Sequence, residues 1–136
     1  MTVHLSSPEG LMQPVPYHHV ASATGARQVH VAGQIARLAD GTPVAPGDLA
    51  GQVAQALRNA SVGLSSAGAS FDDVVRLQFY VTGWRPENIE AFMSGVQSVA
   101  SEIGLPMPMP PASLIGVDYL FEPDVLVEVE ATAVLD

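Results

Sequence analysis

One alternating stretch near the C-terminus constrains the fold of this chain most strongly. In DVLVEVEATAVL (residues 124–135), small or branched apolar side chains occupy every second position: Val125, Val127, Val129, Ala131 and Ala133. A period of two is typical of a β-strand that buries one face in a core. The opposite face carries Glu128 and Glu130, which composition alone explains as acids on a solvated sheet face.

The remaining patterns predict an α+β domain. Asp48 is a good N-cap for a helix that Gly68 ends, and Pro86 begins a second helix that Gly104 ends. A hairpin turn is expected around Gly25. Strands are expected over residues 14–23, 28–36, 71–83, 110–117 and 124–135. This order, β-β-α-β-α-β-β, predicts two helices packed on one face of a mixed sheet.

The alternation also predicts which side chains share a face. In residues 28–36, Val29, Val31, Gly33 and Ile35 are expected on one side of the strand. In residues 71–83, one side of the strand is expected to hold Val75, Leu77, Phe79 and Val81. A glycine within a strand indicates either a bulge or a group that approaches the backbone closely, so Gly33 is of interest.

Length and charge limit the classes of function that the chain can have. At 136 residues the chain is expected to form a single domain over 1–136, with residues 1–13 as a loosely ordered lead-in. Its five arginines and no lysine oppose fourteen acids, for a net charge of −9. Because nucleic-acid binding needs clustered basic side chains, we expect no nucleic-acid partner. The same deficit of basic residues argues against an anionic membrane surface.

The sequence predicts neither a metal site nor a cofactor. It has no cysteine, and its four histidines lack a recognised metal-ligand spacing: His4, His18, His19 and His30. No apolar run is long enough to span a bilayer, and the N-terminus does not resemble a signal peptide, so we expect a cytoplasmic protein. With 48% apolar and only 14% charged residues, we also expect an oligomer that covers the open sheet face.

Several motifs in fixed order resemble the Rid (RidA/YjgF/YER057c/UK114) family. They run from about Pro16 to Leu135: the early P-Y, V-A-G-Q-I, SSAGAS at the end of the first helix, FDDVVRLQFYVT, P-x-x-S-L-I-G-V and LVEVEATAV. The resemblance implies a chorismate-mutase-like fold and a homotrimer with a central barrel. It also implies a small-molecule ligand in a cleft at each subunit interface.

Well-known family members hydrolyse enamines and imines to 2-keto acids and ammonia, so the resemblance implies a related hydrolase. By position, it implies that Glu128 is catalytic and holds the attacking water, and that Tyr17 and Gly33 line the cleft. Backbone groups near Gly33 and Leu114 are expected to polarise the substrate. The family arginine that grips the substrate carboxylate falls on Ala112, which also lines the cleft.

The loss of this arginine changes the expected substrate. A guanidinium binds a carboxylate through paired, charge-assisted hydrogen bonds worth about 1.5–3 kcal/mol each. Without it, a 2-imino acid should bind at least about tenfold more weakly, and an imine, enamine or related carbonyl compound without a 2-carboxylate is favoured.

Two alternatives stay open. The chain could deaminate 2-iminobutanoate or 2-iminopropanoate with Arg27, Arg37 or Arg85 of a neighbouring subunit in place of the missing arginine. It could instead form a non-catalytic, small-molecule-binding or chaperone-like trimer.

Overall fold

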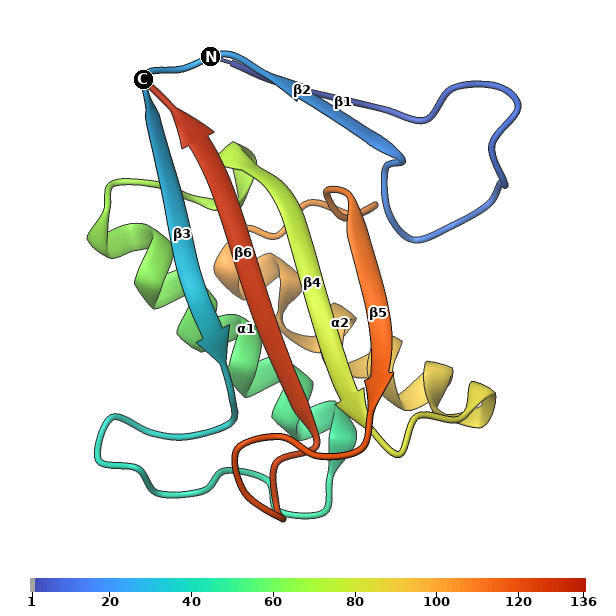
Figure 1. The fold of residues 1–136 in the computed structure, drawn as a ribbon, viewed down its shortest axis with the longest axis vertical. Helices are drawn as coiled ribbons and strands as arrows, with labels where there is room; N and C mark the ends of the chain where they lie inside the picture. Colours follow the sequence, from blue (N-terminus) through green and yellow to red (C-terminus); the bar gives the residue numbers. More distant parts are fainter. Residues whose placement is uncertain (1) are drawn as a thin grey trace.

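The computed structural model describes residues 2–136 and forms a four-stranded sheet with two helices on one face (Figure 1). The strands lie in the order β3-β6-β4-β5. Their bounds are Arg27–Gln34 for β3, Val74–Thr82 for β4, Ala112–Val117 for β5 and Val127–Leu135 for β6. β6 is antiparallel to β3 and β4, whereas β5 is parallel to β4, so the sheet is mixed as predicted.

The two helices begin and end where the sequence indicates. The Asp48 carboxylate accepts a hydrogen bond from the Gly51 amide at the start of α1 (Leu49–Ser66). At its end, Gly68 takes φ +76°, and the Gly68 and Ala69 amides donate to the last carbonyls of the helix. A 3₁₀ turn at Pro86–Asn88 leads into α2 (Ile89–Ile103). The start and end of α1 therefore follow from local capping chemistry, whereas α2 begins without a side-chain cap and ends at Gly104, which takes φ +70°.

The core lies between the helices and one face of the sheet. On β6, Val127, Val129, Ala131 and Ala133 are buried, whereas Glu128, Glu130 and Thr132 on the other side are half-buried. The alternation predicted for this strand is confirmed. We call the helix-free side, which includes Glu128, Glu130 and Thr132, the open face.

A bulge changes the predicted facing at the start of β4. Val74 pairs with Ala133 and Arg76 pairs with Thr132, which leaves Val75 as an extra residue. As a result Val74 is fully buried and Val75 is only half-buried. The prediction that Val75 leads the core-facing set is wrong, because the bulge shifts the alternation by one residue.

The N-terminal strands form a separate small sheet. β1 (Val3–Ser6) pairs antiparallel with β2 (Val20–Ala23), and the pair extends to one side of the main sheet (Figure 1). The predicted hairpin around Gly25 is wrong, because β3 pairs with β6 rather than with β2. The lead-in also differs from its expected loose order over Val3–Ser6, because β2 supplies hydrogen-bond partners for that segment.

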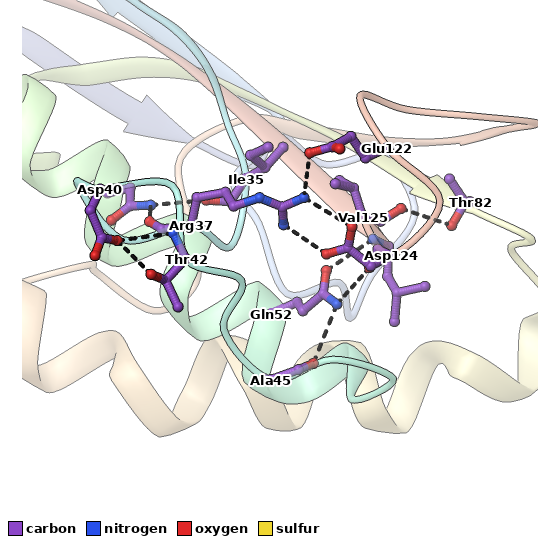
Figure 2. A network of polar contacts seen from close by, with 12 residues as sticks. Ile35, Arg37, Asp40, Thr42, Ala45, Gln52, Thr82, Glu122, Asp124 and Val125 are labelled. Atoms are coloured by element: carbon purple, nitrogen blue, oxygen red, sulfur yellow. Dashed lines mark hydrogen bonds and ion pairs between the residues drawn. The ribbon is translucent and has the colours of Figure 1, made fainter.

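Polar contacts hold the loop before β6 against the loop after β3 (Figure 2). The Arg37 guanidinium donates to both oxygens of Asp124, at 2.7 and 2.9 Å, and to Glu122 at 3.0 Å. Gln52, the one buried polar side chain among residues 2–136, accepts from the Leu126 amide and donates to the Asp124 carbonyl. These bonds hold the segment that leads into β6, which begins at Val127, one residue before Glu128.

Neither helix in residues 2–136 has the length and hydropathy that a membrane crossing requires.

Candidate functional site

Glu128 lies beside Gly33 on the open face. A Cβ atom added to Gly33 would lie 2.5 Å from Cδ and 2.7 Å from Cγ of Glu128. Any larger side chain at this position would therefore displace the glutamate. Both alternatives considered for Gly33 occur, because the Glu128 side chain approaches it closely and the residue also lies in a bulge of β3.

A bulge in β3 turns Gly33 toward Glu128. Val31 pairs with Ala131, but Gln34 pairs with Val129, so β3 has one residue more than β6 in this interval. Val31 packs toward the helices, where a Cβ on Gly63 of α1 would lie 2.8 Å from its Cγ1. The predicted common face for Val31 and Gly33 is wrong, because the extra residue reverses the alternation.

Glu130, the next acid along β6, is bound by a tyrosine that the sequence did not single out. The Tyr80 hydroxyl donates to Glu130 Oε1 at 2.6 Å, and the Gln78 amide donates to the Tyr80 hydroxyl at 3.2 Å. In the sheet register Tyr80 lies directly opposite Glu128. We call Glu128, Glu130, Tyr80 and Gln78 the carboxylate cluster.

The two acids differ in their surroundings. Burial raises the pKa of Glu128, and the nearby Glu130 charge raises it further. The pKa of Tyr80 is also raised, first because its hydroxyl is hydrogen-bonded to the Glu130 carboxylate. Within residues 2–136, the Glu128 carboxylate has no hydrogen-bond or ion-pair partner. Glu128 is therefore available to hold a proton or a water molecule.

The other predicted substrate-binding residues line an apolar pocket of about 240 Å³ beside β5. Tyr17, Ala112 and Leu114 contribute to its wall, and α2 and the segment before β2 complete it. The backbone holds Tyr17 here, because the Met109 amide donates to the Pro16 carbonyl and the His18 amide donates to the Met109 carbonyl. The remaining lining residues are Met12, Val15, Pro16, Phe79, Ile89, Phe92, Met93, Met109 and Ser113.

The pocket and the carboxylate cluster lie on opposite faces of the sheet. Leu114 pairs with Phe79, which is buried under the helices, whereas Glu128 pairs with Tyr80 on the open face. Because successive strand residues point to opposite faces, one subunit does not bring Glu128 to Leu114. The structure thus joins Tyr17 with Ala112 and Leu114, and Glu128 with Gly33, but not the two groups.

Each of the three arginines considered as replacements donates hydrogen bonds to acceptors within its own subunit. Arg37 binds Asp124 and Glu122, whose carboxylates raise its pKa. The other two also have acceptors: Arg27 donates to the Ala67 and Asp136 carbonyls, and Arg85 donates to Glu87.

Sequence reasoning missed Arg76, an exposed side chain of β4. Its Nη2 donates to the Ser113 hydroxyl at 2.7 Å, one residue from Ala112. The missed residues Arg76, Gln78 and Tyr80 all alternate with core positions of β4. That pattern places them on one face, but only the strand register shows that they lie beside β6 and β5.

No group of three or more histidine, aspartate or glutamate side chains within residues 2–136 is arranged to hold a metal ion. The carboxylate cluster has two acids, and one of them is already bound by a phenol hydroxyl.

Comparisons with known proteins place the chain in a family. Residues 11–135 match the family described as Endoribonuclease L-PSP. The Rid family protein YyfB from Yersinia pestis is 37% identical, with a TM-score of 0.86, and the match covers 99% of this chain and 100% of that one. No curated protein matches the sequence.

Two further structures from E. coli share the fold. The yjgF gene product is 24% identical with a TM-score of 0.67, covering 96% of this chain and 92% of its own. TdcF, solved with bound serine, is 21% identical with a TM-score of 0.67, covering 100% and 99%. The family match over residues 11–135 and the likeness to YyfB together show that this chain belongs to the Rid (YjgF/YER057c/UK114) family.

Proposed function

We propose that this protein is a Rid-type hydrolase that acts on an uncharged imine, enamine or related carbonyl compound. Family membership supports a small-molecule function in general. One observation carries the specific proposal: Glu128 is half-buried, its pKa is raised, and its carboxylate has no partner within residues 2–136. A carboxyl group whose pKa lies above its ordinary value is better suited than an ordinary surface carboxylate to accept and return a proton.

A homotrimer would complete the site. In one subunit the apolar pocket and the carboxylate cluster lie on opposite faces of the sheet, so a cleft that uses both needs two subunits. The open face also holds half-buried and exposed apolar side chains, including Ile115 and Val134, which a neighbouring sheet would cover. We infer that Glu128 and Gly33 of one subunit meet Tyr17, Ala112 and Leu114 of the next.

The proposed chemistry uses Glu128 twice. The carboxylate accepts a proton from water as the water oxygen adds to the C=N carbon, and the carboxyl then returns this proton to nitrogen. In the second step Glu128 accepts the hydroxyl proton and gives it to nitrogen, so that the C–N bond breaks and ammonia leaves from a carbonyl product. Backbone groups near Gly33 and Leu114 are proposed to polarise the substrate.

The substrate is proposed to lack a free 2-carboxylate. Ala112 occupies the position of the family arginine, and no charged side chain lines the pocket. Arg27, Arg37 and Arg85 are engaged with acceptors of their own subunit, which disfavours them as replacements. With a net charge of −9, RNA is not proposed as a substrate.

The test is ammonia release from an uncharged imine that is generated in the assay, compared with buffer alone. Glu128→Gln should reduce the acceleration by about a hundredfold or more while the trimer stays intact. Unchanged kinetics would exclude the role of Glu128. A parallel assay with 2-iminopropanoate and semicarbazide tests the deaminase alternative, for which we expect no acceleration over buffer.

The apolar pocket also supports a second candidate, a non-catalytic trimer that binds a small apolar molecule. This candidate predicts that a ligand raises the melting temperature although no imine or carbonyl substrate is turned over.

A further inference from the structure

We propose that the apolar pocket beside β5 binds an uncharged aromatic ring of one or two fused cycles, carrying a single polar group. This inference specifies the substrate class of the site proposed above, but ring binding itself requires no turnover. It is argued from the pocket wall, the volume and the rim.

The wall argues against an anionic ligand. Every lining residue is apolar or aromatic except Ser113 and the phenol end of Tyr17. The Ser113 hydroxyl already accepts a hydrogen bond from Arg76, which reaches it from the open face. An anionic group in this pocket would lose its hydration without a cationic partner, which costs several kcal/mol or shifts its ionisation.

The volume sets the size of the ligand. An apolar cavity of about 150 Å³ holds one benzene molecule, so the volume here of about 240 Å³ fits a substituted benzene or a fused pair of rings. A longer chain would extend past the rim into solvent.

The aromatic side chains that line the pocket favour an aromatic ring over an aliphatic one. Phe79 and Phe92 meet edge to face, with ring centroids 4.9 Å apart and an interplanar angle of 86°. Three methionines, Met12, Met93 and Met109, also line the pocket, and a thioether makes favourable contacts with aromatic edges. Rings prefer such edge-to-face and sulfur contacts by a modest amount beyond the buried area.

The rim gives the ring one polar contact. Among the lining residues, Met12 is 71% exposed and Ile89 44% exposed, whereas Phe79, Phe92 and Met109 are buried. Tyr17 lines the pocket, and its hydroxyl has no hydrogen-bond partner within residues 2–136. This hydroxyl is assigned as the donor to a carbonyl or imine on the ring.

The experiment measures binding of three probes of matched size to the full-length protein by calorimetry. Acetophenone is uncharged and aromatic, benzoate carries a carboxylate, and cyclohexyl methyl ketone is uncharged but aliphatic. Acetophenone should bind about tenfold or more tightly than benzoate and about threefold to tenfold more tightly than the aliphatic ketone. Equal binding of benzoate, which would indicate a contribution from Arg76, overturns the inference, as does equal binding of the aliphatic ketone.

A pair of matched variants locates the ring. Ala112→Leu fills the pocket and should weaken acetophenone binding by about tenfold or more, whereas Ser65→Leu adds a leucine at an exposed position near the end of α1, outside the pocket, and should leave it unchanged. Acetophenone binding that survives Ala112→Leu, or is absent from the unmodified protein, overturns the inference. If Ala112→Leu does not fold, the comparison of the three probes with the unmodified protein still tests the inference.

Failure here is distinguishable from failure of the proposed hydrolase. If the ring does not bind, this inference fails but the hydrolase proposal does not. Ammonia release from small aliphatic imines, compared with Glu128→Gln, still tests the hydrolase. Ring binding without turnover in any assay would support this inference and contradict the hydrolase.

Discussion

At the scale of single residues, Glu128 and Glu130 show how neighbouring positions on one strand acquire different properties. Both are half-buried on the open face of β6. Glu130 accepts a hydrogen bond from Tyr80, whereas Glu128 contacts the backbone at Gly33. The negative charge of Glu130 adds to the effect of burial on the pKa of Glu128. Glu130 would therefore act on the chemistry proposed for Glu128 through its charge.

The raised pKa of Glu128 predicts a pH-dependent effect on stability. A carboxyl whose pKa is higher in the folded state stabilises the fold below its unfolded pKa of about 4.3 and loses this contribution as pH rises through the folded value. Glu128→Gln cannot ionise, so the free energy of unfolding of the variant relative to the natural protein should increase with pH and then level off. Urea unfolding from pH 4 to pH 8, at about one-unit steps, measures this difference.

The matched control is Glu90→Gln, at an exposed position of α2. A difference for Glu128→Gln that stays constant with pH would contradict the prediction.

Gly33→Ala is predicted to separate activity from stability. The added methyl group would collide with the Glu128 side chain, which is flexible and can move aside. We expect a stability loss of about 1 kcal/mol or less, but a fall in kcat of at least about tenfold because the carboxylate is displaced. Steady-state kinetics and thermal unfolding check both parts.

A double variant tests the cause. In the presence of Glu128→Gln, Gly33→Ala should have little further effect on kcat, because both changes act through the same carboxylate. Additive losses would show that Gly33 acts in another way.

At the scale of elements, the start of β6 is held from the side by α1. Gln52 is 1% exposed and bonds to Leu126, Asp124 and Ala45, so one side chain supports the two loops that meet at this end of the sheet (Figure 2). The paired bonds from Arg37 to Asp124 add to the same support and lower the pKa of Asp124. Both contacts act on the segment that carries Glu128.

Gln52→Leu is predicted to destabilise the fold by about 1–3 kcal/mol, because the Leu126 amide and the Asp124 carbonyl lose their partner in a buried place. The matched control is Gln55→Leu, one turn further along α1, where the amide bonds only to Asn59. Urea unfolding of both variants measures the contrast, and equal losses would contradict the proposed support of β6.

At the scale of the whole molecule, the sheet has one face covered by α1 and α2 and one face without a cover (Figure 1). Ile115 of the edge strand β5 is 40% exposed, and its partner in the register is Tyr80 on the open face. A trimer that covers the open face would bury both.

Ile115→Arg is therefore predicted to dissociate the proposed trimer, because it introduces a charge where subunits would meet. Gln97→Arg, on the exposed side of α2, adds the same charge away from the sheet and should leave the assembly intact. Light scattering after size-exclusion chromatography gives the mass of each variant. A monomeric natural protein, or a trimer unaffected by Ile115→Arg, would exclude this arrangement.

Local patterns alone determined much of the fold. The caps at Asp48 and Gly68 and the alternation in residues 124–135 predict α1 and β6, because each depends on residues close in sequence. The same alternation separates Glu128 from the core, and the family motifs single it out from Glu130.

Only the tertiary structure decided which residues meet. The bulges at Val75 and near Gly33 shift the facing of β4 and β3, and they arise from pairing with β6, which is remote in sequence. The pairing of Tyr80 with Glu128, and the separation of Glu128 from the pocket at Ala112, follow from strand register. Register is set by contacts between distant segments, whereas capping and alternation are set within a few residues.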